Sequence, residues 1–396
     1  MIPYGRQNIT DEDIAAVTAA LKSDHLTQGP LIPAFENAFA EYVGARYAVA
    51  VSNGTAALHL AVMAMKDDRP LNVITTPITF AASANCVRYC DGTVWFSDID
   101  PETYLIDIQK VEALINSKPF GFFSGIIPVD LAGNVVNMEG FRTLAEKHKL
   151  WIIEDACHAP GGYFVNSAGQ RVNAGSCQYT DMAVFSFHPV KHIATGEGGM
   201  ITTNDESIYR KLLRLRTHGI TKAAEEFVNP VSVSGGDEKT NTYPGWYMEM
   251  QDLGYNYRLT DIQAALGCSQ LKEAAGRLEQ RKKIAKRYND SFEGKWFVNG
   301  HSKYLDGHAY HLYIIETPHR YELYNYLRGR NIFAQVHYIP CHLMPYYREA
   351  GWKTGDLPNA ERYYQHCLSL PMYPTLTDKE QIDVIESVLA FFEKFS

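Results

Sequence analysis

The sequence predicts an α/β protein in which a large, mostly parallel sheet domain is followed by a smaller α+β domain. Short apolar runs alternate with helical patterns through the first two thirds of its 396 residues. This order builds a parallel sheet that is covered by helices on both faces. Because the chain is longer than a usual single domain, we expect a large domain over 1–250 and a connecting helix with a small domain over 251–396.

Local patterns define the expected elements of the large domain. Apolar runs of strand length occupy 48–52, 72–77, 93–99, 124–131 and 150–156. Helical spacing begins at Thr55 and returns at 138–149. Further along, the apolar run MAVFSF and the strand-like GGMITT enclose a polar turn that contains Lys191. In sheets of this kind a ligand binds at the carboxyl ends of the strands.

The remaining third of the chain contains a long polar segment and a long helical pattern. Residues 219–250 are polar and lack periodicity, so we interpret them as a long loop, and loops of this length are often functional. Residues 259–292 have helical spacing, with Thr260 as a plausible N-cap. We therefore predict one connecting helix that leads into the small domain. The sequence has no internal repeat and no low-complexity segment.

Composition limits the classes of function. The formal net charge of −8 argues against nucleic acid or an anionic membrane as the main partner. No apolar run approaches the roughly 18 residues of a membrane span, and the first residues lack the apolar core of a signal peptide. The seven cysteines include no CxxC, and their odd number excludes a complete set of intrachain disulfides. We expect a cytoplasmic protein without a metal site.

Three polar features together suit pyridoxal 5′-phosphate (PLP). The stretch SNGTAAL combines a tight glycine turn with a helix start, where the N–H groups near Thr55 and Ala56 can bind a phosphate. Asp155 ends the apolar run LWIIED, and Lys191 lies in the turn FSFHPVK. A lysine forms a Schiff base with PLP, and a carboxylate partners the pyridinium nitrogen. The combination is more specific than any one of its members.

Each feature taken alone also has a structural explanation. Asn-Gly turns followed by a threonine cap are common, and Glu154 or Asp155 could cap the next element. A lysine is most often a solvated surface residue. The glycines at 196–199 do not indicate a dinucleotide loop, because a strand rather than a helix follows them.

Five stretches carry a resemblance to one family: SNGTAALHLA, TPITFAASAN, IIEDACHAPGG, FSFHPVKHIATGEGGMITTND and LGYNYRLTDIQAALG. They resemble the DegT/DnrJ/EryC1/StrS sugar-nucleotide aminotransferases, which are PLP enzymes of fold type I. The similarity extends from HLTQGP (25–30) to LSLPMYPTLTDKEQ (368–381). It implies that Lys191 carries the cofactor and that Asp155 holds the pyridinium nitrogen.

The resemblance implies further cofactor contacts, namely Thr55, Ala56 and Ser186 at the phosphate, Phe80 on the ring face and His158 beside the ring. It also implies that Asn256 and Arg258 reach into the site of a neighbouring subunit, so that a homodimer with shared active sites is required for activity. The alternatives are that Phe80 belongs to the core and that Arg258 is a surface cation.

Within the family, RTHGITK (216–222), the segment 246–271 and VHYIPCHLMPYYR (336–348) are most similar to one subgroup. That subgroup moves the amino group of L-glutamate to C4 of a UDP-linked 4-keto-6-deoxy N-acetylhexosamine. The product is UDP-4-amino-4,6-dideoxy-N-acetyl-β-L-altrosamine, a precursor of pseudaminic acid. The resemblance implies substrate contacts from Tyr4, from the turn formed by Leu26, Thr27, Gln28 and Gly29, from Arg258 and from Tyr338.

Three other functions stay open at this point. The acceptor could be another nucleotide sugar, such as the GDP sugar of the perosamine synthases. A related branch of the family consists of dehydratases with histidine in place of the lysine, and Lys191 argues against that reaction. The third alternative is a regulator that binds PLP without turnover.

Overall fold

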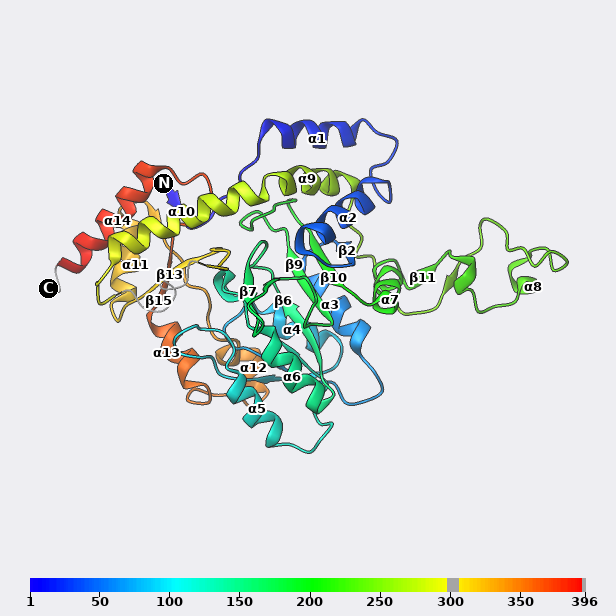
Figure 1. Cartoon of the computed structure of the whole chain (residues 1–396), viewed down its shortest axis with the longest axis horizontal. Coiled ribbons are helices and arrows are strands. Elements are labelled where there is room, and N and C mark those ends of the chain that lie inside the picture. The colour runs from blue at the N-terminus through cyan, green and yellow to red at the C-terminus, as the bar shows by residue number, and fades with distance from the viewer. Residues whose placement is uncertain (298–305, 394–396) are drawn as a thin grey trace.

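A seven-stranded sheet forms the centre of the molecule (Figure 1). The computed structural model describes residues 1–297 and 306–393. The strand order is β2-β10-β9-β6-β5-β3-β4, and β10 runs antiparallel to both of its neighbours while the other paired strands are parallel. The strands are β2 (Tyr47–Val51), β3 (Asn72–Thr75), β4 (Thr93–Phe96), β5 (Gly125–Ile127), β6 (Trp151–Asp155), β9 (Met182–Ser186) and β10 (Gly199–Thr203). The predicted α/β class is confirmed.

Alternating side chains bury both faces of the sheet. In β2, Ala48 and Ala50 belong to one core cluster, whereas Val49 and Val51 belong to another, as the two-residue period of a strand requires. One cluster contains side chains of α2 (Leu31–Val43) and α9 (Asp261–Lys272), and the other contains those of α3 (Gly54–Met65) and α6 (Met138–His148). The helices of the large sheet region are α1 (Asp11–Leu21), α2, α3 (Gly54–Met65), α4 (Ala82–Tyr89), α5 (Ile108–Asn116), α6 (Met138–His148) and α7 (Glu206–Arg216).

The predicted connecting helix is two helices, so the expectation of a single helix over 259–292 is wrong. Thr260 is the N-cap of α9 (Asp261–Lys272) as expected, and it forms a capping box with Gln263. The break falls at Glu273, whose N–H bonds to the carbonyl of Gln270 three residues back, a tighter turn than that of an α-helix. The second helix, α10 (Ala274–Phe292), leads into the smaller part of the molecule (Figure 1).

The C-terminal part has its own apolar cluster. Its elements are β13 (Tyr313–Glu316), α11 (Arg320–Gly329), β14 (Ile332–Phe333), η4 (Cys341–Leu343), α12 (Pro345–Glu349), α13 (Pro358–His366), β15 (Cys367–Leu370) and α14 (Asp378–Phe392). The cluster includes Ile2, because β1 (Ile2–Pro3) pairs with β14. Conversely, Cys341 and Tyr347 pack in the core of the large sheet. The division at 250/251 stays a prediction, and residues 298–305 and 394–396 of its second part lie outside the described residues.

Residues 219–250, expected to be a loop, form an arm that projects from the body (Figure 1). It contains β11 (Ile220–Thr221), η2 (Ala224–Glu226), α8 (Val231–Ser234) and β12 (Glu249–Met250), and β11 pairs with β12. This segment has no periodic pattern because each of these elements is only two to four residues long. Within 1–297 and 306–393, the remaining short elements are η1 (Leu131–Gly133), β7 (Tyr163–Val165) and β8 (Arg171–Asn173).

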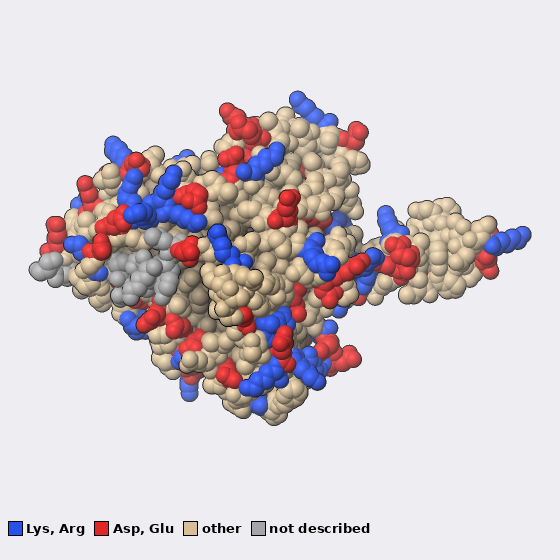
Figure 2. Space-filling view, in the orientation of Figure 1, with Lys and Arg blue, Asp and Glu red and all other residues tan. Residues whose placement is uncertain are grey.

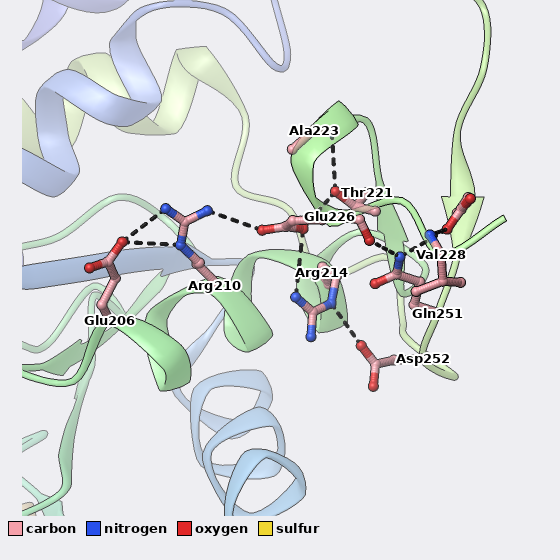
Figure 3. Close-up of polar contacts among 10 residues, drawn as sticks. Glu206, Arg210, Arg214, Thr221, Ala223, Glu226, Val228, Gln251 and Asp252 are labelled. Atoms are coloured by element: carbon pink, nitrogen blue, oxygen red, sulfur yellow. Dashed lines mark hydrogen bonds and ion pairs between the residues drawn. The ribbon is translucent and has the colours of Figure 1, made fainter. Parts of the chain in front are cut away.

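Charged groups fix the base of this arm to α7 (Figure 3). Arg210 pairs with Glu206 at 2.9 Å and with Glu226 at 3.2 Å. Arg214 pairs with Asp252 at 2.9 Å and also approaches Glu226. The arm is therefore attached to a helix of the large domain by ion pairs at both ends of its chain segment.

The viewed surface carries charged side chains of both signs (Figure 2). Figure 2 shows acidic and basic side chains intermixed over the viewed face, including the lobe formed by the arm. Among the described residues no helix combines the length and the apolar character needed to cross a membrane.

Candidate active site

A pocket of about 740 Å³ opens where the strands β6 and β9 end. Its position agrees with the expectation that a ligand binds at the carboxyl ends of the strands. The pocket brings together nine of the residues singled out from the sequence: Tyr4, Thr55, Ala56, Phe80, Asp155, His158, Ser186, Lys191 and Tyr338.

Asp155 is the last residue of β6, and it is buried. Ser83 Oγ donates a hydrogen bond to its Oδ2 at 2.6 Å, and the N–H of Cys157 donates to its Oδ1 at 3.2 Å. The bond to Cys157 is a local turn contact, of the kind expected if Asp155 caps the next element. It leaves the carboxylate on the wall of the pocket, so the turn contact and a ligand contact are compatible. Ser83 was missed because it lies 72 positions away in the sequence.

Lys191 lies in the turn between β9 and β10, and it lines the pocket. Its backbone N–H bonds to the carbonyl of His188 at 2.8 Å, which fixes the turn. Burial lowers the pKa of Lys191, while the neighbouring Cys157 and Asp155 act in the opposite direction. A lysine with a lowered pKa supplies more of the neutral amine that a nucleophile or a general base requires. The alternative of a solvated surface lysine is wrong.

The N-terminus of α3 forms the third side of the site. Gly54 is required there, because a Cβ at this position would lie 2.9 Å from Cβ of Ser186. Asn53, not Thr55, is the N-cap, and its side chain accepts the N–H of Ala56 at 2.8 Å. The expectation that the N–H of Ala56 is free is therefore wrong. The N–H groups of Gly54 and Thr55 precede the first intrahelical bond and are the ones that suit an anion.

His158 and Tyr338 form a fixed pair on one wall. The N–H of Ala132 donates to Nδ1 of His158 at 3.2 Å, so Nδ1 carries no proton. Nε2 then carries the hydrogen and donates to the hydroxyl of Tyr338 at 3.1 Å. Burial lowers the pKa of His158, in agreement with a neutral ring. The hydroxyl hydrogen of Tyr338 is left available to a ligand.

Two further ring side chains, Phe80 and His311, line the pocket. The side chain of Phe80 is 63% exposed, so the alternative that it belongs to the core is wrong. Its ring lies 6.4 Å from that of Tyr338. His311, which the sequence reading did not single out, also lines the pocket, and its ring lies 4.3 Å from that of His158. No spacing pattern in the sequence points to His311.

The other substrate-binding candidates and Asn256, which was expected at the cofactor, lie outside this pocket in the part of the chain that the structure describes. The exposed turn Leu26–Gly29 contacts the start of α9: Thr27 bridges to Thr260, and the N–H of Gly29 donates to Oδ2 of Asp261 at 2.7 Å. Asn256 and Arg258 lie just before this point, bridging to Thr217 and Val51. Asn256 is exposed and Arg258 is half-buried. The residues concerned are Leu26, Thr27, Gln28, Gly29, Asn256 and Arg258.

The large sheet and a pocket that holds a half-buried lysine and a strand-end carboxylate define a PLP-dependent aminotransferase with an α/β fold. The chain belongs to the DegT/DnrJ/EryC1/StrS aminotransferase family, whose model matches residues 7–389.

Relatives of the chain are named for two kinds of pathway. It is 38% identical to the spore coat polysaccharide biosynthesis protein SpsC of Bacillus subtilis, over 98% of this chain and 96% of that protein. It is 36% identical to a UDP-4-amino-4,6-dideoxy-N-acetyl-beta-L-altrosamine transaminase of Campylobacter jejuni, over 100% of this chain and 98% of that protein. Its structure is similar to that of Helicobacter pylori PseC, an aminotransferase involved in the biosynthesis of pseudoaminic acid, with a TM-score of 0.87 at 30% identity and 99% coverage of both chains.

Aminotransferases of this family use PLP, and the residues of the pocket fit it. The close approach of Gly54 to Ser186 leaves space beside the helix N-terminus that a side chain at position 54 would fill. Lys191 offers an amine with a lowered pKa, and Asp155 offers a carboxylate that two donors hold in place. Phosphate, ring nitrogen and aldehyde therefore each have a chemically suitable partner in one pocket.

Proposed function

We propose that this enzyme transfers the amino group of L-glutamate to C4 of a UDP-linked 2-acetamido-4-keto-2,6-dideoxy hexose of L-arabino configuration. The product is UDP-4-amino-4,6-dideoxy-N-acetyl-β-L-altrosamine, a precursor of pseudaminic acid. The observation that carries this proposal is the match to the Campylobacter jejuni transaminase, which extends over the whole of this chain. The pocket volume of about 740 Å³ is within the range of small-molecule sites.

In this proposal Lys191 moves the protons. Its Nζ accepts the proton from the α-carbon of L-glutamate, and in the second half of the reaction it delivers a proton to C4 of the sugar. The lowered pKa favours the neutral amine that the first of these steps needs. When bound, PLP supplies a ring that accepts the electron pair released at the reacting carbon. Asp155 holds the proton of the ring nitrogen in place by its negative charge.

Tyr4, His158 and Tyr338 act at the sugar side of the pocket. Tyr4 is fixed by its backbone carbonyl, which accepts the N–H of Met372 at 2.9 Å, and its ring lies 5.1 Å from that of His337. His158 fixes the hydroxyl of Tyr338 so that its hydrogen can be donated to a sugar oxygen. These contacts orient the 4-keto group toward Lys191.

The second substrate-binding group comes from a partner subunit in this proposal. The turn Leu26–Gly29 and the segment with Asn256 and Arg258 are joined through the start of α9, so one docked surface would present both. Arg258 then pairs with the diphosphate of the UDP-sugar in the partner's pocket. A homodimer with a two-fold axis would complete both sites in the same way.

Complementation tests the shared site. Lys191→Ala and Asn256→Ala proteins are each inactive in this proposal, and mixing them with subunit exchange produces heterodimers in which one site has both residues intact. Random pairing makes half of the dimers heterodimers with one intact site of two, so about one quarter of the wild-type activity should return. If exchange is shown by mass and no activity returns, each site is built within one chain.

A panel of acceptors tests the sugar. The protein, loaded with amino groups by L-glutamate, is incubated with two UDP-linked 4-keto epimers, a UDP sugar with a plain 2-hydroxyl and GDP-4-keto-6-deoxymannose. We expect the L-arabino acetamido sugar to react fastest. The 2-hydroxyl analogue should be rejected, because an unpaired polar group in a closed site costs about 1–3 kcal/mol.

The same panel examines a second candidate. The 38% identity to SpsC shows that relatives of similar closeness are named for another polysaccharide pathway. A preference for the GDP sugar or for the plain hydroxyl sugar would overturn the proposed acceptor and leave transamination of another nucleotide sugar as the function.

A further inference from the structure

Two buried carboxyl groups lie next to Asp155 and have no function in the steps described above. Glu154 precedes Asp155 in β6, so their side chains point to opposite faces of the sheet. Asp130 follows β5, and its backbone N–H donates to the carbonyl of Asp155 at 3.0 Å. Asp130 is 0% exposed and Glu154 is 3% exposed. Buried carboxyl groups are rare unless they are paired.

The register of β5 and β6, which the bridge between Val129 and Asp155 continues, places Asp130 and Glu154 on the same face of the sheet, where their carboxyl groups interact. Oδ1 of Asp130 accepts the N–H of Val136 at 2.9 Å, and Oε2 of Glu154 accepts the N–H of Gly175 at 3.1 Å. Oδ2 of Asp130 is buried and has no donor among the described groups. Two facing carboxylates contain no donor, so one proton between them is what satisfies this oxygen.

The charges around the pair agree with a retained proton. Burial raises the pKa of Asp130 well above its ordinary value, and the negative charge of Glu154 adds to this. Burial also raises the pKa of Glu154, to about 7. The titratable groups that face the pair are Asp155, Cys157 near Asp130 and Cys177 near Glu154. None of these is a cation that would stabilise a second negative charge.

We propose that Asp130 and Glu154 share one proton and act as a positioning pair for Asp155. Through its backbone bond, the pair holds the end of β6, and its single negative charge lies behind the carboxylate of Asp155. Two negative charges then favour a protonated ring nitrogen, which holds that proton more strongly than with Asp155 alone. This inference rests on the assignment of Asp155 to the ring nitrogen, but it does not depend on which sugar is the acceptor.

The first test uses the protein without cofactor. The native state keeps the shared proton through neutral pH, because burial raises the pKa of both carboxyl groups, whereas the unfolded chain releases it near the ordinary carboxyl pKa of about 4. Above this ordinary value the native state binds more protons, so this pair makes the free energy of unfolding fall as the pH rises. Urea denaturation from pH 5 to pH 8 measures the free energy of unfolding at each pH. In Glu154→Gln its fall with rising pH should be smaller by the equivalent of about one bound proton.

Matched comparisons isolate this effect. The buried neutral histidines, His158 and His311 among them, make the free energy of unfolding rise with pH. This contribution is the same in the wild-type protein and in the variant. Glu146→Gln is the control, since Glu146 is exposed on α6. If Glu154→Gln does not fold, Asp130→Asn tests the same proton. An unchanged pH dependence in the folded variant would overturn the shared proton, whatever the enzyme's substrate.

The second test uses the loaded enzyme and its spectrum. In the double variant Asp130→Asn/Glu154→Gln the absorbance change of the bound cofactor with pH should shift to lower pH, because the ring nitrogen has lost one of its two negative neighbours. Either single variant keeps one carboxylate and therefore that negative charge. kcat of the double variant with L-glutamate should fall about 10–100-fold, as for other residues that support a contact residue, while KM changes little. A lost proton linkage with an unchanged spectrum and kcat would show a structural pair and contradict the positioning function. Absence of any reaction in the wild-type enzyme would instead contradict the proposed function.

Discussion

Lys191→Ala should abolish transamination while the protein still folds. The substitution removes both the covalent attachment of the cofactor and the general base, so we expect the rate with L-glutamate to fall by more than about 10,000-fold. Folding should be retained because Lys191 only partly contributes to packing in the turn between β9 and β10. The absorbance of the Schiff base should be absent, as measured on protein that was incubated with PLP and desalted.

Borohydride reduction provides the control for this prediction. Reduction should fix the cofactor covalently in the wild-type protein and in Lys283→Ala, since Lys283 is exposed on α10, but not in Lys191→Ala. Peptide mapping of the wild-type adduct should identify Lys191. A reduced adduct on the Lys191→Ala protein would place the attachment on another lysine and would contradict the assignment.

Asp155→Asn should lower the rate by about three orders of magnitude with cofactor binding largely retained. The amide has the shape of the carboxylate but lacks the charge that keeps the ring nitrogen protonated, and loss of such a charge in a closed site costs about 100–1,000-fold or more. Lys191 and the N-terminus of α3 still hold the cofactor. Single-turnover kinetics with L-glutamate, together with a PLP titration, measure the two effects separately.

Ser83→Ala is the matched variant for Asp155. It removes the 2.6 Å hydrogen bond to Oδ2 but leaves the charge in place, so we expect a loss of about tenfold, the value of one hydrogen bond to a charged group. Near-normal turnover in Asp155→Asn, or a larger loss in Ser83→Ala than in Asp155→Asn, would show that the charge of Asp155 is not what the reaction needs.

The strands and the residues at their ends could be predicted because their signals are local. The apolar runs of the sheet match β2, β3, β4, β5 and β6 to within a few residues, since buried parallel strands are continuous apolar stretches. Asp155 ends one such run, and Lys191 lies in the turn after another. The topology then brings both to one pocket, which is a consequence of the rule that strand ends meet at one edge of the sheet.

Contacts between distant parts of the chain could not be predicted. Ser83 reaches Asp155 across 72 positions, and the pairing of Asp130 with Glu154 depends on the neighbouring positions of β5 and β6. One local error has a different cause. Asn53 competes successfully with Thr55 as the cap of α3, and both residue types are good caps.

The structure of the arm and the break in the connecting helix could not be predicted from local patterns either. The pairing of β11 with β12 involves residues about 30 positions apart, with no periodic pattern between them. Ion pairs from Arg210 and Arg214 of α7 fix the base of the arm, and their partners could not be identified from spacing. The break at Glu273 occurs within a continuous helical pattern that contains neither proline nor glycine at that point.

The half-reaction with L-glutamate is the most direct measurement of the central claim, that this pocket catalyses amino transfer on PLP. The loaded enzyme is mixed with L-glutamate in the absence of any sugar, and the absorbance of the bound cofactor and the released 2-oxoglutarate are both followed. We expect the Schiff-base absorbance to be replaced by that of the amino form, with one 2-oxoglutarate released per pocket. A cofactor that binds but shows no spectral change and no 2-oxoglutarate would contradict the claim and identify a PLP-binding protein without turnover.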